Sequence, residues 1–437
     1  MNFKILIHVI LLLGFNLVFQ ARATENLIVS EINGSYKVIG QISGQDLCLT
    51  NFADEAIQFA IDQLPKGGVV NLQSGKYFVK KQINLKSFIT LTGSGTSSVI
   101  RIQPGHDTGI AIQGDSLVKV IISNFSVVAS KNDSLALSAI KLSGCGDCLV
   151  SDITCMSIKR AGVWFNSSTY LSEIRSCKFL DIEGAGVFLD NLGTGIGGEY
   201  LPNLVNSCIA YRCGIGFLLY RAIVANLNGC IAHQCRNAFN LHRSNSICIT
   251  GGRSFQIEEE AVIVNGSHEI NITGNIFCWS VKEAIKVTNV RWGTITGNNL
   301  IDVGSINYYT PELNPDKKQH LVFPPLADVK IPLYSALTLD DVKGITITGN
   351  ALFNWHVCPK MLYGIYEKDN CSSNLITSNN INWVQNEGVK SLGGNTIVAN
   401  NLTVSDENHL TPHKGVYQVF DVKILDKIIE DMKDYTD

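Results

Sequence analysis

One short phrase recurs at nearly constant spacing through the middle of the chain. The segment Cys208–Leu219 reads CIAYRCGIGFLL, and it returns in Cys230–Leu241 as CIAHQCRNAFNL. Further steps of nearly the same length lead to Gly252, Asn275 and Asn298. The interval is about 22 residues, and a fixed period of this length is typical of a solenoid. Each repeat contains short β-branched runs around a Gly or Asn turn and lacks helical periodicity. The sequence therefore predicts an all-β fold, a right-handed parallel β-helix with one coil per repeat.

Small residues occupy equivalent positions in successive repeats. Cys208 matches Cys230, and Cys213 matches Cys235. Equivalent positions of adjacent coils lie about 4.8 Å apart, so these cysteines are expected to stack in the core. Most of the 13 cysteines should remain thiols, with disulfides between coils as the alternative. Cys145–Cys148 has a zinc-ligand spacing, but no second Cys or His pair follows it, so no metal site is predicted.

The later repeats end on asparagine, usually after Thr-Gly. Asparagine tolerates a left-handed backbone, and its amide can bond the same residue in the next coil. A structural asparagine column is therefore predicted, comprising Asn275, Asn298, Asn350, Asn379 and Asn400.

The N-terminus and the overall charge limit the possible settings and partners. Lys4, the apolar run 5–19 and an Ala-x-Ala site at 21–23 indicate a secretory signal peptide at residues 1–23. We expect a secreted or periplasmic protein without membrane insertion after cleavage. The 437-residue chain has a formal net charge of −3, which argues against nucleic acid as a partner.

Residues 24–437 are predicted to form a single β-helix domain. An amphipathic helix at Asp54–Leu64 would cover the open end of the solenoid. Two stretches without the repeat, 190–203 and 302–339, are long enough to be walls of a groove. The expected parts are an N-terminal lead and cap (24–86), the coils with both insertions (87–404), and a C-terminal tail and helix (405–437). The last helix is interpreted as a lid, or alternatively as a subunit contact in a homotrimer.

The start of the mature chain resembles a known superfamily. Asp54–Asp62 reads DEAIQFAID, Gly67–Val70 reads GGVV, and Ser74–Tyr77 reads SGKY. This pattern is similar to the opening of the pectate-lyase-like superfamily. The resemblance implies a parallel β-helix and a polysaccharide as substrate or ligand. It does not specify the reaction, because lyases, hydrolases, epimerases and phage spikes share this fold.

Alternation along the strands predicts an outer surface suited to sugars. Aromatic and polar side chains alternate there with core residues, and such mixtures meet both the C–H faces and the hydroxyls of sugars. The predicted substrate-binding residues are Trp164, Phe188, Asp190, Tyr220, Arg221, Asn240 and Lys286.

One candidate catalytic pair lies before these strands. Glu260 and Glu283 precede matching alanines, so they are expected one coil apart, with Lys282 nearby. Such a pair can act as general acid and base. Glu259-Glu260 is similar in place to the paired Asp of polygalacturonases, although that family's other motifs are absent. A solvated turn is the alternative interpretation. Asp340-Asp341 is assigned to the other strand of its coil.

A second candidate lies where the strands end. There His242 can remove the C5 proton of a uronate, and Arg221 or Arg243 can neutralise the carboxylate. Calcium is only weakly supported, since Asp190 is the one nearby carboxylate, and no other cofactor is predicted. The Asp-Pro-His-Asp signature of alginate epimerases is absent. The coil 228–241 is similar to the active coil of inulin fructotransferases, but Gly229 and Asn240 stand where that family has Asp and Glu.

These observations favour an enzyme that cleaves or epimerises an acidic glycan, as a monomer or homotrimer. A non-catalytic glycan-binding or adhesion protein is the first alternative. A trimeric structural protein, or one related to the fructan transferases, is the second.

Overall fold

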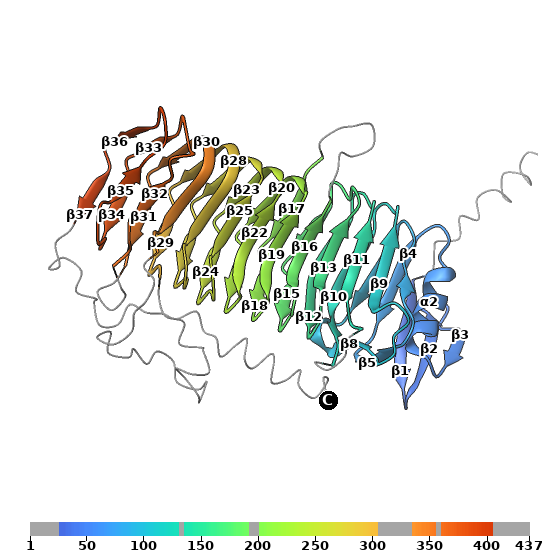
Figure 1. Ribbon diagram of the computed structural model, residues 1–437. Helices are drawn as coiled ribbons and strands as arrows, with labels where there is room; N and C mark the ends of the chain where they lie inside the picture. The colour runs from blue at the N-terminus through green and yellow to red at the C-terminus, as the bar shows by residue number, and fades with distance from the viewer. Residues whose placement is uncertain (1–25, 131–134, 192–200, 305–333, 355–359, 405–437) are drawn as a thin grey trace, which may run out of the picture.

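The computed structural model describes residues 26–130, 135–191, 201–304, 334–354 and 360–404. These residues form a parallel β-helix of about 12 turns (Figure 1). The expected signal peptide, the C-terminal helix and most of both insertions lie outside the described residues. Strand β30 begins at Leu337, so the last residues of the expected second insertion belong to the solenoid.

Strands of successive coils stack into three parallel sheets. The sheet that carries the candidate residues is called the site sheet here. It contains β6 (Ile83–Asn84), β9 (Ile110–Asp115), β11 (Ser138–Ser143), β13 (Ala161–Asn166), β16 (Ala185–Asp190), β19 (Ile215–Tyr220), β22 (Asn237–His242), β25 (Val262–Asn265), the first parts of β28 (Ile285–Thr296) and β30 (Leu337–Thr348), β32 (Ile365–Glu367) and β35 (Val389–Ser391).

The other two sheets complete each coil. The second contains β4 (Gly68–Leu72), β7 (Ile89–Gly93), the first parts of β10 (Ile121–Val128) and β12 (Leu149–Met156), β14 (Glu173–Arg175), β17 (Asn203–Asn206), β20 (Ile223–Asn228), β23 (Asn245–Thr250), β26 (His268–Thr273), the ends of β28 and β30, β33 (Leu375–Thr377) and β36 (Ile397–Ala399). The third contains β5 (Gly75–Val79), β8 (Ser98–Ile102), the ends of β10 and β12, β15 (Lys178–Leu180), β18 (Ile209–Tyr211), β21 (Ile231–His233), β24 (Arg253–Phe255), β27 (Ile276–Cys278), β29 (Asn299–Ile301), β31 (Ala351–Phe353), β34 (Asn380–Asn382) and β37 (Leu402–Val404).

The N-terminal end has a different architecture. Strands β1 (Leu27–Ile32), β2 (Ser35–Gly40) and β3 (Asp46–Thr50) pair antiparallel, and β1 joins the stack by pairing parallel with β4. Helix α2 (Ala53–Asp62) matches the predicted helix and lies at this end of the stack (Figure 1). Its buried residues repeat with helical spacing and pack against the surrounding strands, which is the amphipathic pattern predicted from the sequence.

One column of the corner between the second and third sheets changes its chemistry along the solenoid. Cys177, Cys208 and Cys230 occupy this column in successive coils, and all three are fully buried free thiols. The predicted stacking of Cys208 on Cys230 is thus confirmed. The column continues through Gly252 into Asn275, Asn298, Asn350, Asn379 and Asn401. All twelve cysteines among the described residues are free.

The asparagine column forms a continuous hydrogen-bonded ladder. Asn298 Nδ2 donates to Asn350 Oδ1 at 2.9 Å and to the Ile272 carbonyl at 2.9 Å. The Asn298 Oδ1 accepts both the backbone N–H and the Nδ2 of Asn275. The left-handed position is the residue before each ladder asparagine. Asn400 occupies that position with φ 54°, so Asn401, not the predicted Asn400, belongs to the ladder.

Removal of a central ladder residue should be costly. In Asn298→Ala the backbone and amide donors of Asn275 lose their buried acceptor, and we expect a loss of about 3 kcal/mol in the free energy of unfolding. Urea unfolding followed by circular dichroism measures the loss. Thr294→Ala is the matched control, because Thr294 makes one partly buried side-chain hydrogen bond in the same coil. Equal losses in the two variants would contradict a structural role specific to the ladder.

Candidate active site

The outer surface of the site sheet carries three columns of side chains, and this surface is called the site face. A break in the alternation explains the third column. Ala238 and Phe239 are consecutive residues and both belong to the core, although the register to the preceding strand is continuous. The residue three positions before the middle column therefore faces outward as well, as Ala161 and Ala185 do beside Trp164 and Phe188. The start column contains Ala161, Ala185, Ile215, Asn237, Glu260 and Glu283; the middle column Lys141, Trp164, Phe188, Leu218, Asn240, Ile263 and Lys286; the end column Asn166, Asp190, Tyr220, His242, Asn265, Thr288 and Asp340.

The two predicted glutamates lie on this face rather than in a solvated turn. Glu260 is 5% exposed and Glu283 is 8% exposed. Lys286 Nζ lies 3.3 Å from Glu260 Oε1, and Lys282 Nζ lies 3.9 Å from Glu260 Oε2. Glu283 Oε2 is buried without a hydrogen-bond partner in the described part of the chain. The structure thus brings together Glu260, Glu283, Lys282 and Lys286.

Asp340 is a charged residue of this face that the sequence argument assigned elsewhere. It pairs in register with Thr288 and so belongs to the end column. Its carboxylate accepts hydrogen bonds from Lys368 Nζ at 2.6 Å and Asn370 Nδ2 at 2.7 Å. These bonds hold the pKa of Asp340 below its usual value, and the charge of Lys286 acts in the same direction.

A sequence signal for Asp340 existed. The phrase TITGN occurs at 294–298 and again at 346–350, and the interval between these two phrases also leads from Thr288 to Asp340. The long insertion hid this relation because the regular count along the repeat breaks there.

The predicted cluster at the strand ends contains a stacked Tyr–His pair. The rings of Tyr220 and His242 lie 5.4 Å apart with an interplanar angle of 8°. Arg221 and Arg243 follow them at the corner, each with a left-handed φ of 52°. Burial lowers the pKa of His242, and the charges of Arg243 and Arg221 lower it further. His242 is therefore a neutral imidazole at neutral pH, as a general base requires.

Asp190 has local partners instead of His242. The indole Nε1 of Trp164 donates to Asp190 Oδ2 at 3.3 Å, and Asn166 Nδ2 donates to the same oxygen at 3.4 Å. In the end column Tyr220 separates Asp190 from His242. Asp190 thus flanks the Tyr–His pair without contacting the imidazole.

Trp164 and Phe188 lie on the predicted face, but their rings are largely covered. They are 7% and 8% exposed and stack on one another at 5.6 Å. Arg160 contributes to the cover, with its guanidinium carbon 4.0 Å from the Trp164 ring centroid. The rings are therefore too covered for the sugar stacking that was expected, and the side chain that covers them is cationic. The alternation of residues along the strand could not predict this burial, because Arg160 lies in the preceding turn.

Neither a metal cluster nor a membrane helix is found in the parts of the chain that the structure describes. No group of three or more His, Cys, Asp and Glu residues there could hold a metal ion. No described helix has the length and apolar character needed to cross a membrane.

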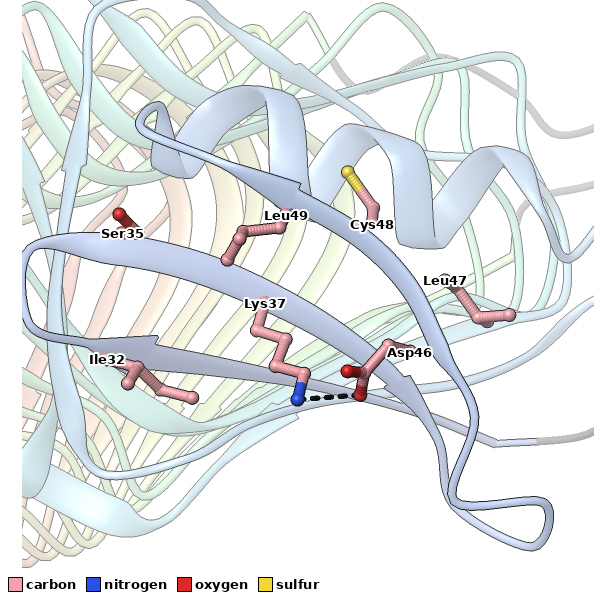
Figure 2. Close-up of a pocket in the computed structure, with 7 residues that line it drawn as sticks. All are labelled: Ile32, Ser35, Lys37, Asp46, Leu47, Cys48 and Leu49. Atoms are coloured by element: carbon pink, nitrogen blue, oxygen red, sulfur yellow. Dashed lines mark ion pairs between the residues drawn. The ribbon is translucent and has the colours of Figure 1, made fainter.

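A hollow of about 550 Å³ lies away from the site face, on the N-terminal sheet (Figure 2). Figure 2 shows the ion pair between Lys37 and Asp46, whose atoms lie 2.7 Å apart, along its wall. The remaining lining residues are Ile32, Ser35, Leu47, Cys48 and Leu49. Its ionisable groups are this ion pair and the Cys48 thiol, whose pKa is raised by burial, so the candidate chemistry stays on the site face.

Comparison with solved structures identifies the fold class. The A-module of the mannuronan C-5 epimerase AlgE4 from Azotobacter vinelandii superposes with a TM-score of 0.62 at 15% identity, covering 79% of this chain and 95% of that chain. The catalytic unit of a GH87 α-1,3-glucanase from Streptomyces thermodiastaticus gives 0.56 at 13% identity, covering 82% and 66%. Tailspike protein 3 of bacteriophage CBA120 gives 0.51 at 10% identity, covering 82% and 59%. No protein-family profile matches the chain, and no curated protein matches it in sequence.

The chain therefore has a parallel β-helix fold, which its opening motif and its repeat predicted. Its site face carries the stacked Tyr220–His242 pair, with Arg221 and Arg243 beside it.

The effect of the two arginines on the pKa of His242 should be measurable. In Arg243→Ala the pKa of His242 should rise toward its usual value, because one neighbouring positive charge no longer opposes protonation. NMR titration of the imidazole signals measures the change. Arg253→Ala serves as control, since Arg253 lies in β24 of the third sheet. A pKa of His242 that responds equally to both substitutions would contradict the assignment.

Proposed function

We propose that this protein acts on an acidic polysaccharide and removes the C5 proton of a uronate residue at the Tyr220–His242 pair. The observation that carries the proposal is the position of His242, stacked on Tyr220 and beside Arg221 and Arg243. Proton abstraction beside a carboxylate requires an unprotonated base and a cation that stabilises the enolate-like intermediate. The mannuronan C-5 epimerase of similar fold shows by its name that one such β-helix performs uronate chemistry.

The proposal gives each residue a role. An arginine pairs with the uronate carboxylate, and His242 takes the C5 proton. In elimination the C5–H electron pair forms a C4–C5 double bond, the C4–O bond breaks, and the leaving oxygen takes a proton from the Tyr220 hydroxyl. In epimerisation the intermediate instead takes a proton on its opposite face. Asn240 lies in the middle column, on the same strand as His242 of the end column, and would bind a sugar hydroxyl.

Both outcomes can be measured in one experiment. Pectate, alginate and glycosaminoglycans are incubated with the full chain in D2O. Deuterium at C5 is followed by NMR, and unsaturated uronate by its ultraviolet absorbance. His242→Ala should lower the rate by about 100-fold or more, the usual contribution of a general base. Tyr220→Phe should reduce elimination while leaving glycan binding intact.

The control variant is His268→Ala, because His268 is exposed on the second sheet and should leave the rate unchanged. If no acidic glycan either exchanges its C5 proton or gains a C4–C5 double bond, the uronate chemistry is wrong. Retention of the protein on a glycan affinity gel would then favour the non-catalytic binding protein.

A second candidate function is glycoside hydrolysis at Glu260 and Glu283. The favouring observation is that Glu283 is buried without a partner for Oε2 in the described part of the chain, while Glu260 one coil away is held by two lysines. Paired carboxylates in unlike surroundings are suited to divide the roles of acid and base.

Hydrolysis predicts a different response to substitution. Glu283→Gln and Glu260→Gln should each abolish the release of new reducing ends and leave binding intact, while His242→Ala should retain turnover. Glu259→Gln is the matched control, since Glu259 is half-exposed and its carboxylate lies 3.6 Å from Lys282 Nζ. Unchanged turnover in both glutamate variants would eliminate this candidate.

The cellular location and the oligomeric state expected from the sequence are also part of the proposal. A secreted or periplasmic protein, monomeric or homotrimeric, would meet a polymeric glycan outside the cytoplasm.

A further inference from the structure

Two cations meet on one aromatic ring in the N-terminal half of the site face. Lys141 precedes Trp164 in the middle column, and its Nζ lies 4.5 Å from the indole centroid. The guanidinium of Arg160 lies 4.0 Å from the same ring and 5.6 Å from the ring of Phe188. The indole, whose own N–H is bonded to Asp190, therefore supports two positive charges at once.

Neither cation has a carboxylate partner among the described residues, which sets them apart from their neighbours. Lys159, next to Arg160 in the chain, pairs with Glu183 at 2.6 Å. At the C-terminal half of the face, Lys286 pairs with Glu260 and Lys368 with Asp340. Two like charges on one ring repel each other, and a bound anion would relieve that repulsion.

We infer that Arg160 and Lys141 form a distal subsite for the carboxylate of an acidic sugar, remote from the residue that reacts. Trp164 lies three strands before His242 in the stack, through β16 and β19. At about 4.8 Å per coil the separation is roughly 14 Å. A pyranose ring is about as long as one coil spacing, so a chain lying along the coils presents a carboxylate here some three residues from the reacting uronate.

The substrate class follows from this spacing. The subsite selects glycans that carry carboxylates on several successive residues, a polyuronate in preference to a neutral glycan with an occasional uronate. Arg160 supplies a planar fork that fits a carboxylate with two parallel hydrogen bonds, and Lys141 adds a point charge. The inference rests on the proposed uronate chemistry, which sets where the reacting sugar lies on the site face. Its test, however, measures binding of the oligomer and not the reaction.

Arg160→Gln and Lys141→Gln test the subsite, since glutamine keeps part of the stem over Trp164. Binding of galacturonate and mannuronate oligomers, as disaccharides and as hexasaccharides, is measured by calorimetry. Each variant should weaken binding of the hexasaccharide about tenfold and leave the disaccharide unchanged. Tryptophan fluorescence and circular dichroism check that the fold is retained. Lys159→Gln is the matched control, with the same loss of charge from a lysine that is already paired.

The outcomes separate the subsite from the chemistry. If the hexasaccharide binds all three variants with equal affinity, the subsite is wrong even when C5 exchange occurs. If Arg160→Gln weakens only the long oligomer while no oligomer exchanges its C5 proton or gains a C4–C5 double bond, the subsite stands and the proposed reaction fails. Equal weakening of disaccharide and hexasaccharide would show that Arg160 acts on the whole face and would overturn a distal role.

Discussion

Every feature of this molecule depends on backbone pairing between equivalent positions of successive coils. The pairing holds only if each corner turns in the same way, and the corners do so through single left-handed residues. Before the ladder asparagines these are Gly274, Gly297 and Gly349, then Ser378 and Asn400. A left-handed residue other than glycine costs about 1–2 kcal/mol. The asparagine ladder offsets that cost at the C-terminal end, where its amides bond both the next coil and the previous one.

The same pairing decides where chemistry can occur. Equivalent positions of adjacent coils are about as far apart as two aromatic rings in contact. Different residues that occupy one column can therefore contact each other. His242 lies on Tyr220 for the same reason that Phe239 lies on Phe217 in the core, where the rings are 5.1 Å apart. Glu260 likewise lies beside Glu283 because each stands two residues before a strand of the site sheet, and these two strands pair in register. A solenoid builds a site by placing one residue per coil, and the site is therefore elongated along the stack.

The repeat predicted most of this arrangement. Counting along the repeat placed Tyr220, His242 and Lys286 on one outer face, and the register confirms it. The count failed in two places for physical reasons. Two consecutive core residues, Ala238 and Phe239, break the alternation, and the residue before each such pair faces outward; Glu260 is therefore a buried residue of the face, although it lies in the segment that enters β25. Trp164 is buried by a side chain of the neighbouring turn, and the repeat length of the sequence does not predict such side-chain packing.

The ion pairs of the site face differ on the two sides of the coil of His242, and under the proposed function this difference would orient a polyanionic ligand. On the N-terminal side Lys141, Arg160 and Arg221 lack carboxylate partners among the described residues, whereas on the C-terminal side Glu260 and Asp340 are paired with lysines. A polyanion gains from the first half and gains little from the second, where the lysines are already neutralised. The reacting residue would then lie near one end of the bound segment. Under the proposed elimination, cleavage at that position would leave one fragment on the cationic half and free the other fragment from the half whose lysines are already paired.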